Sequence, residues 1–387
     1  MKRALLAAAG VLGVFVLSLL LFASAIVDRA ANRVLNAPPY TAGSEAEKLY
    51  RDLFVVDLHG DPLLWDRDLN ERLSHGAIDV PRLVEGNVGI QCFFIVSKSP
   101  YGQNIDLTEE DSDAITALAI LQGWPQRTWN SLFERALFQS ERLHRFAEQS
   151  GGRLVVIQSK GDLRRYRAER AQNTDVVGGI LGVEGAQVLE GDVNNVGKLF
   201  DAGVRIIAPT HFFDNDIGGS AHGVEKGGLT ELGAQMIAEM EARGILLDLA
   251  HASPALMRDA LSIATRPVVV SHTGVKGTCD NNRNLGDEQL QGIAASGGVV
   301  GIGYWDTAVC GKDAAAIARA IRYTVDRVGV DHVALGSDFD GAVPVPFDTT
   351  GLALIAEALL EDGFTENDIR DIMGENALRV LEQTLPE

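Results

Sequence analysis

Metal-capable side chains stand where several apolar runs of the sequence end. The clearest run covers residues 54–61 (FVVDLHGD) and stops at His59 and Asp61. Because side chains alternate along a strand, these two would project from one face and offer an imidazole and a carboxylate to one metal ion. Similar runs end at Glu184, His211, His251 and His272. Several strands that end in ligands predict one shared rim.

The candidate ligands mix imidazole and carboxylate groups, which suits zinc or a similar divalent transition metal. They are His59, Asp61, Glu184, His251 and His272. Five ligands are too many for one tetrahedral ion but suit two ions that share a carboxylate, and Glu184 is the predicted bridge because it lies between the two groups in the chain. Paired ions about 3.5–4 Å apart can turn a bridging water into hydroxide near neutral pH and polarise a carbonyl. The pattern therefore predicts hydrolysis.

Position in this pattern separates the candidate histidines from the others. A lone histidine at a strand end is usually structural, but four of the eight histidines end apolar runs. Surface or loop roles are expected for the other four, His75, His144, His222 and His332. Asp338 closes the last run, and since Asp340 suits the turn before Gly341, Asp338 is left for proton transfer.

Strand and helix patterns alternate along the body of the chain. The continuous apolar run at residues 88–96 is typical of a parallel strand buried on both faces, and helical segments separate the later runs. Alternation with polar residues at strand ends predicts a (β/α)8 TIM-type barrel, whose reactions occur on the C-terminal rim. Nine strand candidates compete for eight places, and residues 154–157 are the predicted surplus. A doubly wound sheet is the alternative, but it would gather ligands at one switch point.

The chain divides into three parts. Residues 1–27 contain an apolar run from residue 4 that is long enough for a transmembrane anchor, while Ala23-Ser24-Ala25 matches the cleavage site of a signal peptide. In either case Lys2 and Arg3 should stay cytoplasmic, which puts the catalytic domain outside the cytoplasm, membrane-anchored or secreted. Residues 28–48 are predicted to be a polar linker and residues 49–387 a single catalytic domain.

Composition excludes several classes of protein. The 34 basic and 53 acidic residues give a net charge of −19, which argues against nucleic acid because neutralising phosphates needs basic surface. The hydrophobic content of 46% excludes disorder, and three cysteines exclude a disulfide-dense scaffold. Cys279 and Cys310 follow adjacent predicted strands, so a disulfide and two free thiols are both open; Cys92, inside a buried strand, should stay reduced. A homodimer is also open.

Seven motifs, in matching chain order, resemble the renal (membrane) dipeptidase family of zinc peptidases over about residues 50–380. They are the HxD pair in VDLHGD, DVPRL with the following GNVG, GVEG at Glu184, DLAHAS at His251, SH at His272, RNL from Arg283 and GSDFDG at Asp338. The chain departs from the family at residues 279–282 (CDNN), where members often have His-Pro. That departure leaves the local loop shape and the side-chain preference open.

The resemblance implies a binuclear zinc barrel of the amidohydrolase type that cleaves dipeptides. Carried over by position, His59 and Asp61 would bind the first zinc, Glu184 would bridge, and His251 and His272 would bind the second. His211 would polarise the scissile carbonyl, Asp338 would carry the proton to the leaving amine, and Arg283 would hold the substrate carboxylate.

Arg283 bears on substrate length. Its planar fork matches a free carboxylate, so a clamp on the C-terminus would make tripeptides poor substrates; a surface ion pair with Asp280 or Asp287 is the alternative. Two other functions stay open. The same site could act on another amide, a lactone or a D-amino-acid-containing fragment, or the barrel could be a non-catalytic binding protein. The complete ligand set disfavours the binding protein.

Overall fold

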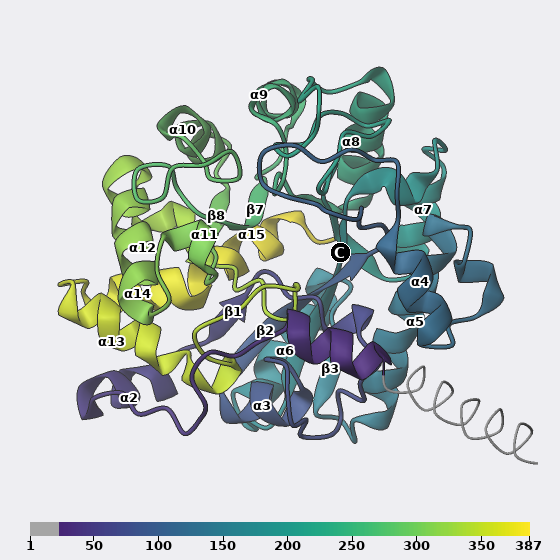
Figure 1. The fold of residues 1–387 in the computed structure, drawn as a ribbon. Helices are drawn as coiled ribbons and strands as arrows, with labels where there is room; N and C mark the ends of the chain where they lie inside the picture. Colours follow the sequence, from purple (N-terminus) through teal and green to yellow (C-terminus); the bar gives the residue numbers. More distant parts are fainter. Residues whose placement is uncertain (1–22) are drawn as a thin grey trace, which may run out of the picture.

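The computed structural model describes residues 23–387, and its centre is a curled sheet of parallel strands (Figure 1). The strands are β1 (Val55–Asp57), β2 (Val88–Val96), β3 (Leu154–Val156), β4 (Val177–Glu184), β5 (Val204–Ile207), β6 (Leu246–Leu247), β7 (Val269–Thr273), β8 (Val299–Ile302) and β9 (Val333–Leu335). Hydrogen bonds join them in the order β6-β5-β4-β2-β1-β9-β8-β7. A parallel bridge from Asp248, directly after β6, to Val269 of β7 joins the two ends. The predicted TIM-type barrel is confirmed.

β3 has no place in this ring. It pairs with β4 only over Val177–Gly179, before β5 takes over the same strand at Leu181. The eight residues of β4 outrun the four of β5, which leaves the start of β4 free for a short extra strand. Residues 154–157 are the surplus strand, as predicted.

Helices surround the barrel. They are α2 (Ser44–Arg51), α3 (Val80–Glu85), α4 (Ala114–Leu121), α5 (Leu132–Gln149), α6 (Lys160–Arg170), α7 (Asn195–Asp201), α8 (Glu231–Arg243), α9 (Pro254–Ile263), α10 (Asp287–Ala295), α11 (Asp306–Val309), α12 (Ala314–Val328), α13 (Ala353–Glu361), α14 (Glu366–Arg370) and α15 (Asn376–Thr384). Short 3-10 turns lie at η1 (Pro62–Leu64), η2 (Gln126–Thr128), η3 (Ala186–Leu189), η4 (Val330–His332) and η5 (Thr349–Gly351), and a π-helical turn at η6 (Asp371–Glu375).

Local sequence sets where several helices begin. The side chains of Asp79, Ser131, Thr230 and Asp313 accept a backbone hydrogen bond at the starts of α3, α5, α8 and α12. Ser253 does the same for α9, only two residues after His251. This cap makes a helix begin directly behind one of the candidate ligands, which limits how far that loop can move.

The barrel interior is packed closely where the site begins. Every residue of β2 is buried. The ring of Phe94 lies 4.1 Å from the imidazole of His59, centroid to centroid, and a Cβ on Gly182 of β4 would come within 2.7 Å of Phe94. Only glycine fits there, so β4 can approach the aromatic ring that supports His59.

Residues 23–43, here called the N-terminal segment, include most of the predicted linker at residues 28–48. They are helical over 23–31 and then run beside the loop after β9. Leu35 donates its backbone N–H to Val345 at 2.9 Å, and Val345 donates to Arg33 at 2.9 Å. The predicted linker over 28–48 is therefore packed on the barrel, with its last residues forming α2.

The predicted anchor or signal segment at residues 1–27 falls mainly outside the described residues, since the structure describes the chain from residue 23. Among residues 23–387, no helix combines the length and the apolar character that a membrane span requires.

Candidate active site

The predicted ligands converge on the carboxylate of Glu184 at the C-terminal end of the barrel. Glu184 Oε1 lies 2.9 Å from His251 Nε2, 3.4 Å from His272 Nε2 and 3.7 Å from His59 Nε2. Asp61 joins the group, with Oδ2 3.5 Å from His59 Nε2. None of the five side chains is more than 5% exposed. Residues that are far apart in the sequence therefore form one compact buried cluster.

The other predicted residues complete the same site. His211 Nε2 is 3.2 Å from Glu184 Oε2. One carboxylate oxygen of Asp338 lies within 4.8 Å of the possible ligand atoms of His59 and Asp61. A cavity of about 330 Å³ opens over the cluster. Its polar lining includes Asp61, Glu184, His211, His251, His272, Arg283 and Asp338.

The spacing of the ligand atoms in the cluster and the buried atoms that lack a hydrogen bond both fit bound metal. Three groups of side chains have donor atoms close enough to hold an ion: His59, Glu184 and His272; Glu184, His211 and His251; and His59, Asp61 and Asp338. Within the described residues, His59 Nε2, Asp61 Oδ1 and Glu184 Oε1 are buried without a hydrogen-bond partner. Buried polar atoms are normally satisfied, so these unpartnered nitrogen and oxygen atoms fit the ligands of a metal cation.

Burial sets the protonation of these groups. It raises the pKa of Glu184 and Asp61 well above the usual range and lowers the pKa of His251 and His272 well below it. The pKa of Asp338 is also raised well above its usual value, first by burial and then by the charge of Asp61. Neutral imidazole is the form that binds metal, and a divalent cation would favour the ionised carboxylates.

Two buried aspartates, which the sequence analysis did not single out, connect the strand ends that carry the candidate ligands. Asp57 accepts hydrogen bonds from the backbone N–H and the hydroxyl of Ser337, at 2.9 and 2.6 Å, which ties β1 to the loop of Asp338. Asp248 accepts from the backbone N–H of Ser271 at 2.8 Å, which ties the end of β6 to β7. Each carboxylate stands two or three residues before a ligand histidine in an apolar run, a signal that could have revealed both.

His222 lies in a loop, as one of its two predicted roles allowed, but it is buried beside the site and not on the surface. It is 1% exposed, with Nδ1 3.0 Å from the carbonyl oxygen of Ile105 and Nε2 3.1 Å from His251 Nδ1. Burial lowers the pKa of His222 to about 3, so it is neutral. Since a carbonyl only accepts, the His222 proton is on Nδ1, and Nε2 accepts from His251. That leaves His251 Nε2 free to face Glu184. His222 was missed because no apolar run ends there.

Arg283 lies in the wall of the cavity, not on the surface. It is 5% exposed, and its Nη2 donates to the backbone oxygen of His272 at 2.6 Å. The alternative surface pair is contradicted: in the described chain Arg283 forms no ion pair with Asp280 or Asp287, and Asp287 pairs with Arg327 at 3.0 Å. Burial lowers the pKa of Arg283, while the nearby carboxylates of Asp338 and Glu184 oppose that shift.

A disulfide braces the loop of Arg283. Cys279 and Cys310 are bonded, with their Cα atoms 5.3 Å apart, so the bond that the sequence left open is present. Asn281 adds a second brace, because its Oδ1 accepts the backbone N–H of Arg283 at 2.9 Å. Cys92 is free and buried, as expected.

The loop after β9 is under backbone constraint. Asp338, Asp340 and Ala342 have φ values of 59°, 63° and 60°, in the left-handed region that non-glycine residues rarely adopt. A Cβ on Gly341 would lie 1.9 Å from Asp338 Oδ1, so this position requires glycine. Asp340 does more than form the predicted turn: its carboxylate accepts the backbone N–H groups of Ala77 and Ile78 at 2.9 and 3.0 Å.

Comparison with known proteins agrees with this geometry. The family model described as membrane dipeptidase (peptidase family M19) matches residues 44–385. The chain belongs to this family. Dipeptidase verJ of Clonostachys rogersoniana is 26% identical over 360 residues, covering 88% of this chain and 86% of verJ. The solved structure of dipeptidase AC, a metallopeptidase of family M19, has 26% identity and a TM-score of 0.71, covering 87% of this chain and 99% of that one.

A third comparison supports the fold. The metallopeptidase from Rhodobacter sphaeroides, solved with a phosphinate mimic of the dipeptide L-Ala-D-Ala, is 24% identical with a TM-score of 0.69, covering 86% of this chain and 99% of that one. All of the predicted site residues lie inside the region matched by the dipeptidase family. Two residues that line the same cavity, Val27 and Ala31, lie before it.

Proposed function

We propose that this member of the membrane dipeptidase family hydrolyses dipeptides at a pair of zinc ions. His59 and Asp61 would hold the first ion, His251 and His272 the second, and Glu184 both. Dipeptidase verJ and dipeptidase AC, which are similar over most of the chain, support the substrate class.

One observation carries the metal assignment. The three ligand histidines all present Nε2 to Glu184 because each has its Nδ1 engaged elsewhere. Ser271 Oγ lies 3.0 Å from Nδ1 of both His59 and His272, and His222 Nε2 lies 3.1 Å from Nδ1 of His251. Hydrogen bonds of this kind hold the imidazole ligands of metal sites in the orientation and tautomer that bind the metal.

The protein's own groups divide the remaining work. Zinc bound there would supply an activated water and polarise the scissile carbonyl. His211, whose Nε2 lies beside Glu184, would donate a hydrogen bond to the carbonyl oxygen as negative charge develops. Asp338 would deliver a proton to the leaving amine, a task for which its raised pKa suits it. Arg283 would bind the free carboxylate of the second residue.

A panel of small substrates tests this function. We expect the full chain to hydrolyse free dipeptides, to lose that activity with a chelator and to regain it with zinc. A lactone and an N-acyl amino acid serve as the other members of the panel. Turnover of only those two would indicate a different metal hydrolase, and a metal-loaded protein with no turnover at all would favour the binding-protein hypothesis.

We also propose that the catalytic domain works outside the cytoplasm, on a retained anchor or as an exported protein. The apolar run at residues 4–27 after Lys2 and Arg3 supports export, and the Cys279–Cys310 disulfide suits an oxidising compartment. Alkaline phosphatase fused after Glu387 should be active, since it needs disulfides. An inactive fusion beside an active cytoplasmic reporter at the same position would contradict export. Membrane fractionation then separates the anchored form from the released one.

A further inference from the structure

One side of the catalytic cavity is built by the N-terminal segment, which lies outside the matched family domain. Val27 and Ala31 line the same cavity as Glu184 and Asp338. These two residues are one helical turn apart within the helix at 23–31, so they share a face. Val27 is 46% exposed, so its side chain is open to solvent as well as lining the cavity.

The adjoining face of this helix attaches it to the barrel. Ser24, Asp28 and Asn32, spaced by four residues, are 6%, 3% and 4% exposed. Ala31 packs against a hydrophobic cluster that includes Leu64, Trp65, Ile115 and Leu118. Those four side chains also line the cavity, so the helix and the barrel together form a continuous apolar wall.

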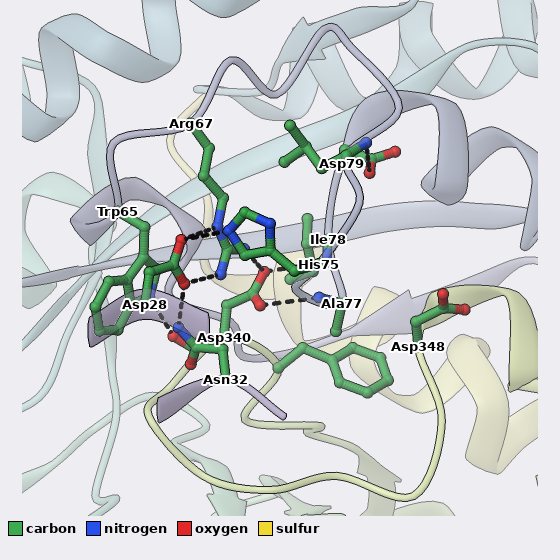
Figure 2. Close-up of polar contacts among 12 residues, drawn as sticks. Asp28, Asn32, Trp65, Arg67, His75, Ala77, Ile78, Asp79, Asp340 and Asp348 are labelled. Carbon is green, nitrogen blue, oxygen red and sulfur yellow. Dashed lines mark hydrogen bonds and ion pairs between the residues drawn. The ribbon is translucent and has the colours of Figure 1, made fainter. Parts of the chain in front are cut away.

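A buried ion triad fixes the position of the helix (Figure 2). Asp28 Oδ2 accepts from Arg67 Nε at 2.8 Å, and Arg67 Nη1 lies 2.7 Å from Asp340 Oδ2. His75 Nε2 is 3.0 Å from Asp28, and Asn32 Nδ2 donates to Asp28 at 2.8 Å. These contacts of Asp28, Arg67 and Asp340 are here called the latch. Removing one partner of a buried charge pair is costly because it leaves the other charge unpaired.

The latch also reaches the loop of Asp338. Asp340, which closes the triad, is two residues from Asp338, and Asn32 Oδ1 accepts the backbone N–H of Ala342 at 2.9 Å. Both Asp340 and Ala342 hold left-handed backbone conformations. The N-terminal segment therefore braces the strained loop that carries the proton-transfer group as well as walling the cavity.

We propose that the N-terminal segment is a specificity wall: Val27 and Ala31, held in place by Asp28, Arg67 and Asp340, limit the size of the apolar side chain that a dipeptide substrate can carry. The proposal rests on the proposed dipeptidase function. Its ligand class is dipeptides with apolar side chains, because the wall offers only hydrocarbon and aromatic surface. Segments outside the family domain would then tune the substrate range while the metal cluster stays unchanged.

Adjacent residues of the helix provide a matched test. Val27→Phe fills the cavity, whereas Ile26→Phe adds the same ring at a position that is 58% exposed and does not line the cavity. Val27→Phe should lower kcat/KM for leucyl-leucine about tenfold relative to glycyl-glycine, with unchanged zinc content, and Val27→Ala should shift the ratio the other way. Ile26→Phe should behave as wild type. An unchanged ratio in folded, zinc-loaded Val27→Phe would overturn the wall.

Trypsin tests the latch without relying on activity. Arg29 and Arg33 lie in the N-terminal segment, and the docked segment should resist cleavage after them. Asp28→Asn keeps the shape of the side chain but removes its charge, so cleavage there should become about tenfold faster while the barrel stays intact. Equal cleavage of the two proteins would overturn the latch. If the wild-type protein hydrolyses no dipeptide, the proposed function fails, but this readout still decides whether Asp28 holds the segment.

Discussion

The two sides of the catalytic cavity are built in different ways. The polar side consists of His59, Asp61, Glu184, His251 and His272, which come from the ends of barrel strands. Its three histidines are oriented by hydrogen bonds to Ser271 and His222. The apolar side consists of Val27, Ala31, Leu64, Trp65, Ile115 and Leu118, which come from separate connecting segments and meet through packing and one ion triad. The proposed metal ligands and the apolar lining therefore come from different parts of the chain, and the N-terminal segment links the two sides because Asn32 bonds to the loop of Asp338.

The polar side should give the largest effect. Glu184→Gln should lower metal occupancy at both positions, because a neutral amide does not bridge two cations as a carboxylate does. The loss of activity should exceed the about 10–100-fold typical of changing a hydrogen-bond partner of a ligand. His59→Ala is the control and should mainly empty one position. Metal analysis of the purified variants decides, and two fully loaded positions in Glu184→Gln would remove the bridging role.

Arg283 also lines the cavity, and the loss of activity on replacing it should depend on the substrate. Arg283→Met should leave metal content unchanged and raise the activation free energy that corresponds to kcat/KM on free dipeptides by about 2–5 kcal/mol, since a charged partner of the substrate carboxylate is removed. C-terminal amides of the same dipeptides should lose far less. Tripeptides should be poor substrates of the wild-type protein. Equal losses on the acids and the amides would refute the clamp.

His222 tests whether the polar side depends on its supporting hydrogen bonds. His222→Phe removes the acceptor of His251 Nδ1, and zinc affinity should fall about 10–100-fold at one of the two positions. His222→Gln, whose carbonyl can still accept that hydrogen bond, should retain more affinity. Competition with a chromogenic chelator measures both. If His222→Phe and His222→Gln bind zinc as tightly as the wild type, His222 only fills space.

The smallest effect should come from the apolar side, where acid should remove the stability that the Asp28 carboxylate contributes. Burial alone would raise the pKa of Asp28, but the hydrogen bond and charge of Arg67 outweigh it and the pKa is lowered. Asn32, His75 and Asp340, through Arg67, also face this carboxylate. A lowered pKa stabilises the folded state above the usual aspartate pKa of about 3.9, and the gain is lost as the pH falls through the folded value.

Asp28→Asn should therefore lower the free energy of unfolding by about 1–3 kcal/mol at neutral pH. The cost stays moderate because Arg67 is still paired with Asp340 in the variant. The difference in free energy of unfolding between the wild type and the variant should become smaller only below about pH 4. Urea unfolding of both proteins across this range checks the sign. A gap that grows on acidification would contradict it.

The sequence reveals the polar side because strand ends of a parallel barrel must meet at one rim. An apolar run that stops at His59 or Glu184 carries that information locally, so the convergence of these side chains at one rim could be predicted before the fold was known. The motifs of the family resemblance added roles for His211 and Arg283. His222 could not be found in this way, since it comes from an irregular loop that approaches His251 only in three dimensions.

For a similar reason, the sequence did not predict that the N-terminal segment lines the apolar side of the cavity. Proline and polar residues in 28–48 indicate a linker when read alone, and nothing in the local pattern shows that Asp28 pairs with Arg67, which in turn pairs with Asp340. Long-range pairs of this kind depend on which loops the barrel brings together. A buried carboxylate in a predicted linker is visible only after folding, and that is why the segment looked separable from the catalytic domain.

Stepwise zinc addition to the chelator-treated full chain, with hydrolysis of alanyl-alanine followed at each step, tests the two-ion dipeptidase most directly. Because Glu184 is the proposed bridge between two ions, we expect activity to rise until two equivalents per chain are bound and then to stay constant. Full activity at one equivalent, or no hydrolysis at any zinc content, would contradict the proposed function.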